Sequence, residues 1–200
     1  FPKQESEIKE VVLEVKNLVR EPHTKNVSFK VHAGEIVGLS GLVGSGRSET
    51  AQVIFGIEQA DSGEILVDGK KVDIKTPAQA IKHGIAYVPE DRAKQGLVRE
   101  MTIRENISMS IMEQVSNATF IDFDAEKLLA QDAIKKFGIR AYGTEQIANN
   151  LSGGNQQKVV VGKWLASNPR LLIIDEPTRG VDVGAKSEIH RLISELAAKQ

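Results

Sequence analysis

The sequence predicts an α/β fold with a parallel sheet and an attached antiparallel β layer. Short segments rich in valine and isoleucine alternate with segments whose apolar residues recur every three or four positions, which is typical of strands alternating with helices. A glycine-rich loop at 41–48 also stands between a predicted strand and a predicted helix. In such a sheet we expect ligands to bind beyond the carboxyl ends of the strands.

The first half of the chain supplies most of the predicted strands. Segments 11–16 and 27–31 alternate apolar and polar residues and are rich in valine. Segment 62–74 predicts a hairpin, because Asp68 and Gly69 are favoured in a two-residue turn. The other predicted elements are a strand at 35–40, a helix at 47–56, a helix at 77–84 that Gly84 ends, and a strand at 85–89.

The second half is predicted to be helical from about residue 100 to residue 150, most clearly at 124–139. Segment 151–166 predicts a turn that leads into a helix, and 171–174 predicts an apolar strand followed by two acidic residues. The polar residues 1–10 indicate a linker. The last residues stop within a helical pattern, which favours a segment of a longer polypeptide.

The composition argues against several classes of function. The chain has 26 Lys and Arg against 27 Asp and Glu, so no basic surface for nucleic acid is indicated. It has no cysteine, which excludes disulfides and thiolate zinc sites. Its four histidines are scattered and form no ligand cluster. No apolar run approaches the roughly 20 residues of a membrane helix, and no signal-peptide pattern is present. Any work at a membrane is therefore expected to go through another chain.

The loop at 41–48, GLVGSGRS, matches the phosphate-binding pattern G-x-x-x-x-G-K-[ST] except at Arg47. Its backbone N–H groups can surround phosphate oxygens, and the following helix adds a favourable dipole. The hydroxyl of Ser48 is placed to ligate Mg²⁺. Because the lysine is missing, this segment by itself is compatible with two interpretations, a nucleotide-binding loop and a glycine-rich turn without a ligand.

Segment 171–176, LLIIDE, delivers two carboxylates at the end of an apolar strand. Asp175 is predicted to hold Mg²⁺ through water, and Glu176 to orient or deprotonate an attacking water. Apolar strands that end in acidic residues are common, so this segment does not decide the function by itself.

Segment 151–158, LSGGNQQK, resembles the signature sequence of ABC ATPases. Its alternative interpretation is a serine N-cap with two glycines in a turn. The glycine loop, LLIIDE and this segment stand in the order and at the spacing of that family, and the resemblance covers nearly the whole chain after residue 10. It implies the P-loop NTPase fold of ABC ATPases, C-terminally truncated, with a RecA-like parallel core, an N-terminal antiparallel β layer and an inserted helical subdomain.

Smaller segments also resemble the family. YVPEDR at 87–92 has Glu90 in the glutamine position of the Q-loop, MTIRENI follows at 101–107, and TRGVD at 178–182 resembles the D-loop with Asp182 as its aspartate. Together with DEPTRGVDVGAK, these segments are similar to the second nucleotide-binding half of monosaccharide importer ATPases of the ribose, galactose and xylose type. In that family one polypeptide carries two such halves.

The resemblance implies domain limits. It predicts a linker at 1–10 and one ABC nucleotide-binding domain at 11–200, with a core at about 11–95 and 156–200 and a helical subdomain at about 96–155.

The resemblance also implies ATP and Mg²⁺ as cofactors. Glu176 and Glu90 take the catalytic positions, and Ser48, Asp175 and Glu90 take the metal positions. The residues implied to contact ATP are Gly41, Leu42, Val43, Gly44, Ser45, Gly46, Arg47, Ser48, Glu49, Leu151, Ser152, Gly153, Gly154, Asn155 and Asp182.

The resemblance implies as partners a second nucleotide-binding domain of the same polypeptide and transmembrane permease subunits. A periplasmic or extracellular sugar-binding protein is implied as an indirect partner. No nucleic acid is expected as a partner. The permease is expected near Glu90–Gly96 and the helical region, which places the protein peripherally at the cytoplasmic face of the cell membrane.

Three features depart from the family pattern. Arg47 is a planar fork in place of a compact lysine charge. Glu90 adds a negative charge near the γ-phosphate, unless Mg²⁺ or Arg92 offsets it. Around 18–25 the adenine-stacking aromatic is absent, and His23 is interpreted as a surface residue of a loop. The family's switch histidine would lie beyond the end of this sequence.

ABC sites are shared, since the phosphate loop of one half faces the signature of the other. We therefore predict a degenerate, slow site at Arg47 and a signature, Leu151–Gly154, that completes the partner's site. Two other functions stay open: a nucleotide-binding regulatory module without turnover, which Arg47 favours and Glu176 opposes, and a soluble ABC protein that acts on ribosomes or DNA, which the near-neutral charge disfavours.

Overall fold

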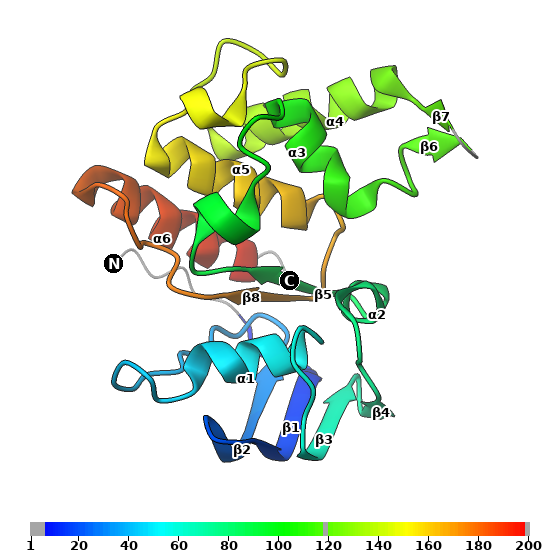
Figure 1. Ribbon diagram of the computed structural model, residues 1–200, viewed down its shortest axis with the longest axis vertical. Helices are drawn as coiled ribbons and strands as arrows, with labels where there is room; N and C mark the ends of the chain where they lie inside the picture. Colours follow the sequence, from blue (N-terminus) through cyan, green and yellow to red (C-terminus); the bar gives the residue numbers. More distant parts are fainter. Residues whose placement is uncertain (1–6, 118–119, 199–200) are drawn as a thin grey trace. The chain divides into compact units, whose positions relative to one another are not determined.

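The computed structural model describes residues 7–117 and 120–198, and its contacts divide the chain into two compact units. The sheet unit comprises 1–87, 170–175 and 191–200, and the helical unit comprises 88–169 and 176–190. Figure 1 shows the elements of both units in sequence colours. The predicted limits of the core and of the helical subdomain stay predictions.

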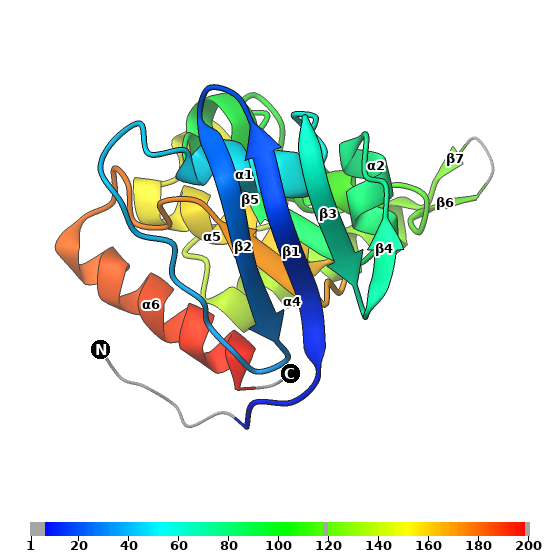
Figure 2. The ribbon, with the colours of Figure 1, turned by 90° about the horizontal axis from the view of Figure 1, so that it is seen from below.

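The sheet unit is built on a four-stranded antiparallel sheet in the order β2-β1-β3-β4 (Figure 2). Its strands are β1 (Val11–Arg20), β2 (Thr24–His32), β3 (Ser62–Val67) and β4 (Lys70–Val72). Leu13 and Val15 of β1 are buried, as the alternating sequence predicts, and Val12 and Leu18 are buried as well, where the pairing of β1 departs from a regular register. Asp68 and Gly69 both have positive φ, which confirms the predicted hairpin turn.

Helices and a second strand pair complete the sheet unit. These elements are α1 (Arg47–Ile54), α2 (Pro77–Lys82), β5 (Ile85–Val88) and β8 (Leu171–Ile174), with β5 paired to β8. Helix α2 begins at a capped turn, because Thr76 accepts a hydrogen bond from the N–H of Gln79 and Pro77 takes the first helical position. The predicted helices and strands in these segments are confirmed.

The predicted strand at 35–40 is wrong. These residues carry no strand in the structure, and no described strand pairs with them. A strand requires a neighbour for its backbone N–H and C=O groups. Without one, the apolar pattern does not produce burial, and the side chains of Ile36 and Leu39 are 58% and 43% exposed.

The helical unit is mainly helical, as predicted. Its elements are η1 (Arg92–Gly96), α3 (Ile103–Ser108), η2 (Met109–Ile111), β6 (Ser116–Asn117), β7 (Phe120–Ile121), α4 (Phe123–Phe137), η3 (Ala148–Asn150), α5 (Gly153–Leu165) and the first part of α6 (Val183–Ala197). Helix α3 packs against α4 and α5. The β6–β7 pair was not predicted, because two residues a side are too few to show a strand period.

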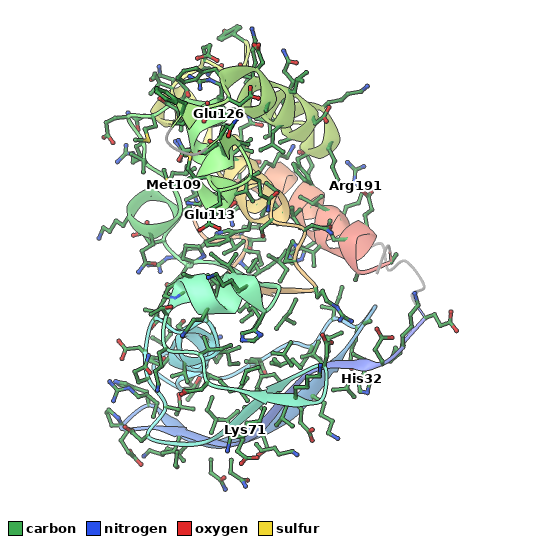
Figure 3. The ribbon with its side chains drawn as sticks, turned by 90° about the vertical axis from the view of Figure 1, so that its right-hand side faces the viewer. His32, Lys71, Met109, Glu113, Glu126 and Arg191 are labelled. Carbon is green, nitrogen blue, oxygen red and sulfur yellow. The ribbon has the colours of Figure 1, made fainter. Side chains whose placement is uncertain are left out.

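A polar network lies inside the helical unit. The carboxylate of Glu126, on α4, is 1% exposed and accepts hydrogen bonds from Arg104 and from the hydroxyl of Ser108 (2.5 Å). Figure 3 labels Glu126 among these helices. Arg104 also pairs with Glu145, and this hydrogen bond is the main reason that the pKa of Arg104 is raised. The buried carboxylate is therefore paired, as a buried charge must be.

Candidate functional site

Gly46 fixes the base of the glycine loop. It precedes α1 in the left-handed conformation (φ 85°), and a Cβ on it would lie 2.2 Å from the backbone oxygen of His23. The hydroxyl of Thr50 donates to the oxygen of Gly46 (2.7 Å) and lies 3.1 Å from the hydroxyl of Thr24. Only glycine fits this position, because both its conformation and the space around it exclude a side chain.

The outer part of the loop is open. Leu42 and Val43 are 86% and 98% exposed, and the N–H of Ser45 donates to the oxygen of Leu42 (3.1 Å). Gly44 has φ 80°, and nothing lies within 4 Å of where its Cβ would be. The loop therefore leaves backbone open at Gly44 and Ser45, beside the exposed side chains of Leu42 and Val43. The predicted contact residues Gly41 to Glu49 all lie here, exposed up to Ser45 and partly buried from Arg47 to Glu49.

The residues before the second strand contain no aromatic ring for adenine. His23 is exposed, as predicted, and its carbonyl rather than its ring faces Gly46. Its backbone therefore contributes to the shape of the loop base, a role that the sequence pattern did not indicate.

Asp175 follows strand β8 and meets a tyrosine of the neighbouring strand. The hydroxyl of Tyr87, in β5, donates to Oδ2 of Asp175 (3.2 Å). Burial and then the charge of Asp175 raise the pKa of Tyr87, so that the phenol stays neutral. Glu176, the next residue, is exposed and has a positive φ of 44°, an uncommon conformation for a residue with a side chain.

Magnesium requires hard oxygen ligands, and Ser48 and Asp175 supply a hydroxyl and a carboxylate. Within residues 7–117 and 120–198, no group of three or more His, Cys, Asp or Glu could hold a metal ion. Mg²⁺ commonly keeps several waters and binds through one or two protein ligands plus phosphate oxygens. These two side chains therefore fit a hydrated Mg²⁺ that arrives with a nucleotide.

In the helical unit, each residue of the segment Glu90-Asp91-Arg92 has a defined partner. Glu90 forms an ion pair with Arg179, Asp91 accepts from the N–H groups of Ala93 and Lys94, and Arg92 donates to the backbone oxygens of Arg179 (2.7 Å) and Gly180 (3.0 Å). Of the two alternatives given for offsetting the charge of Glu90, Mg²⁺ and Arg92, the contacts of Arg92 do not support the second. Arg179 supplies the counter-charge, because the guanidinium of Arg92 is directed to carbonyl groups.

The signature segment lies at the beginning of α5. Ser152 precedes the helix and is exposed, but its side chain makes no capping hydrogen bond to the backbone. Its hydroxyl accepts from the amide of Asn155 (2.9 Å), whose oxygen accepts from the N–H of Arg140 (2.9 Å). The alternative interpretation of Ser152 as an ordinary N-cap is therefore not supported.

Gly153 is enclosed by the loop at 179–180. A Cβ on Gly153 would lie 2.6 Å from Nη2 of Arg92 and 3.1 Å from the oxygen of Gly180. Arg92 thus holds three segments of the helical unit: the Glu90 segment, the signature and the residues before Asp182. Asp182 itself is exposed and precedes α6.

Tyr87 and Arg179 are site residues that the sequence pattern did not indicate. Tyr87 carried a usable signal, because a tyrosine within an apolar strand needs a partner for its hydroxyl. Arg179 carried none, since nothing in the local pattern relates it to a residue 89 positions earlier.

Comparison with known families identifies the class of the chain. The model of the family "ABC transporter" matches residues 24–179. The solved structure of a nucleotide-free ATP-binding cassette from an ABC transporter has a TM-score of 0.78 at 27% identity and covers 95% of this chain and 78% of its own. A cassette of an ABC transporter in its ADP conformation gives the same TM-score over 96% of this chain. The chain belongs to the ABC transporter family and has the ABC ATPase fold, which confirms the predicted fold class.

Curated relatives are similar over the whole chain. The "Ribose import ATP-binding protein RbsA" of Halalkalibacterium halodurans is 49% identical over 98% of this chain, and the protein of the same name from Geobacillus kaustophilus is 49% identical over 100%. The chain spans 40% of the length of each of these relatives. Within the described part of the chain, no helix is both long and apolar enough to cross a membrane.

Proposed function

We propose that this chain is a nucleotide-binding domain of a monosaccharide importer of the ribose and galactose type, and that it binds ATP with Mg²⁺. The observation that carries the proposal is a glycine loop that only glycine can form at Gly46, in the same chain as a signature whose Ser152 is exposed rather than used as a cap. The ribose import names of relatives 49% identical support the substrate class.

The residues of the sheet unit take the phosphate and metal roles. Backbone N–H groups of the loop donate to phosphate oxygens, and Arg47 adds a positive charge in the lysine position. Ser48 and Asp175 hold the hydrated Mg²⁺, which neutralises phosphate charge when it is bound.

The acidic residues beyond strand β8 and in the Q-loop segment take the catalytic roles. Glu176 accepts a proton from the attacking water and orients it. Glu90, in the Q-loop position, remains a predicted catalytic and metal-facing residue, and its pairing with Arg179 supports the view that its charge is compensated.

The signature serves the partner's nucleotide in this proposal. Leu151 to Asn155 and Asp182 face the phosphate loop of a second nucleotide-binding domain, where Ser152 and the glycine N–H groups donate to the γ-phosphate. ATP hydrolysis at the phosphate loop of this chain is slow because of Arg47, whereas the signature segment is intact. Retention of Glu176 opposes the alternative of a regulatory module without turnover, and the near-neutral charge opposes the alternative of a ribosome- or DNA-associated protein.

Calorimetric titration of ATP into this chain, with and without Mg²⁺ and repeated on Arg47→Lys, tests nucleotide binding. We expect the wild type to bind and Mg²⁺ to tighten binding. If the wild type fails and lysine restores binding, arginine has disabled the pocket and the signature is the main contribution. If neither binds, the proposal of a nucleotide site is wrong.

The asymmetry is tested in the longer two-half protein. We expect Ser152→Arg to abolish ATPase activity, because a bulky cation blocks the contact with the partner's γ-phosphate, and Arg47→Ala to cost little. Steady-state phosphate release measures both variants. If Arg47→Ala abolished ATPase activity and Ser152→Arg cost little, the prediction that Arg47 marks the slow site would be wrong.

Transport roles follow from the same proposal. The partners are permease subunits that contact the region of Glu90–Gly96, and an external sugar-binding protein acts through them, which places the chain peripherally at the cytoplasmic face of the membrane. Co-purification of the longer protein with a permease tests this, and co-purification with ribosomes instead would contradict it.

A further inference from the structure

Tyr87 is the one polar side chain of a buried strand. The other residues of β5, Ile85, Ala86 and Val88, are apolar and at most 1% exposed, and Tyr87 itself is 4% exposed. A buried tyrosine needs a partner for its hydroxyl, and here the partner is Oδ2 of Asp175 at 3.2 Å. The hydrogen-bond acceptor of this hydroxyl is therefore the carboxylate of Asp175, which the proposed function assigns to the Mg²⁺ site.

Helix α1 fixes the direction of the phenol. The ring of Phe55, at the end of α1, lies 5.4 Å from the ring of Tyr87 with a tilt of 35°. The same helix carries Ser48 in its first turn. The helix that follows the phosphate loop thus holds both the proposed serine ligand and the tyrosine that contacts Asp175.

The hydroxyl of Tyr87 donates to one of the two carboxylate oxygens of Asp175, Oδ2. Asp175 has two oxygens with about four acceptor positions between them, so one hydrogen bond at Oδ2 leaves Oδ1 available.

We propose that Tyr87 is a positioning residue for the magnesium site: its hydroxyl holds Oδ2 of Asp175 so that Oδ1 is presented to hydrated Mg²⁺. This inference rests on the proposed function of the chain. Carboxylates that bind metals are commonly oriented by a hydrogen-bond donor, and loss of such a donor typically lowers metal affinity about 10- to 100-fold.

Tyr87→Phe tests the inference because it removes only the hydroxyl and keeps the ring against Phe55. Calorimetry of ATP binding in EDTA and in excess Mg²⁺ gives two dissociation constants, and their ratio measures how much Mg²⁺ increases the affinity for ATP. We expect the affinity in EDTA to match the wild type and the Mg²⁺-dependent tightening to fall about 10-fold. Tyr142→Phe is the matched control, since the side chain of Tyr142 is fully exposed, and it should behave as wild type in both conditions.

A double-mutant cycle with Asp175→Asn separates positioning from a general structural effect. If Tyr87 acts through Asp175, Tyr87→Phe should change the metal response of Asp175→Asn less than about twofold, since residues that act through one contact are not additive. A full additional loss in the double variant, or loss of binding in EDTA by Tyr87→Phe, would overturn the inference.

The two proposals fail in different ways. If the wild type tightens on ATP with Mg²⁺ and Tyr87→Phe responds equally, the positioning role is wrong and the nucleotide site stands. If the wild type binds ATP in neither condition, the proposed function is wrong and the positioning role falls with it.

Discussion

The two glycine-rich segments of this molecule obtain their shapes in different ways. In the phosphate loop, Gly44 and Gly46 have φ values of 80° and 85°, and the outer residues Leu42 and Val43 lie in the open. In the signature, Gly153 has no left-handed conformation to satisfy, but the guanidinium of Arg92 and the carbonyl of Gly180 occupy the space where a side chain would be.

Backbone conformation requires glycine at positions 44 and 46, whereas packing requires it at position 153. The phosphate loop is specified largely by its own residues, with one close contact at its base. The signature is shaped by residues about 60 positions before it and about 27 positions after it in the chain. The closer of these contacts, with the guanidinium of Arg92, is a side-chain contact that can give way, whereas the contact with Gly180 is to its backbone oxygen. Substitutions should therefore have larger effects at the base of the loop than in the signature.

Gly46→Ala should have the largest effect. The left-handed conformation costs about 1–2 kcal/mol for alanine, and its Cβ would lie 2.2 Å from a backbone oxygen that cannot move freely. We expect a loss of more than about 3 kcal/mol in the free energy of unfolding and loss of ATP binding, measured by urea denaturation and calorimetry.

Gly44→Ala is the control for Gly46→Ala. It has a similar φ, but nothing lies within 4 Å of its Cβ position, so only the conformational cost of about 1–2 kcal/mol applies. Equal destabilisation by the two variants would show that the contact with His23 does not constrain the loop.

Arg92→Gln should have an intermediate effect. It removes two charge-assisted hydrogen bonds to the oxygens of Arg179 and Gly180, and we expect a loss of about 1.5–3 kcal/mol. Hydrogen exchange at 179–182 and at the start of α5 should rise, whereas ATP affinity of the phosphate loop should stay unchanged.

Lys94→Gln serves as the control for Arg92→Gln. Lys94 is in the same turn, is 85% exposed and makes only a long ion pair of 3.9 Å, so its substitution should change stability by less than about 0.5 kcal/mol. If Arg92→Gln also leaves hydrogen exchange unchanged, packing does not shape the signature.

Asn155→Ala should have the smallest effect of the three. It frees the hydroxyl of Ser152 and the N–H of Arg140, both at the surface, and we expect a loss of about 1 kcal/mol. Asn150→Ala, at an exposed position nearby, is the matched control. An ATPase assay of the longer protein shows whether the orientation of Ser152 matters: faster or unchanged turnover in Asn155→Ala would contradict an ordering role.

Much of the fold follows from local pattern. Alternation at 11–16, the Asp68-Gly69 turn and the helical period at 124–139 each specify a structure within a few residues, and the structure confirms all three. The segment 35–40 has the same apolar signal, but a strand also needs a partner strand, which no local pattern supplies.

The residues of the candidate site likewise fall into two groups, those that a local sequence pattern indicates and those that only tertiary contacts reveal. Gly46 and Ser48 are recognisable because the loop has its own sequence pattern. The counter-charge of Glu90 and the donor to Asp175 come from Arg179 and Tyr87, which are 89 and 88 positions away in the chain. Such pairs depend on tertiary structure, which is why Arg179 was not among the alternatives for the counter-charge.

The network around Glu126 has a consequence for the helical unit taken by itself. Its members, Arg104, Ser108 and Glu145, all belong to residues 88–169, so these contacts close within one compact unit. Compensation of the buried carboxylate is therefore an internal property of this unit, and loss of Arg104 would leave a buried negative charge without its cation.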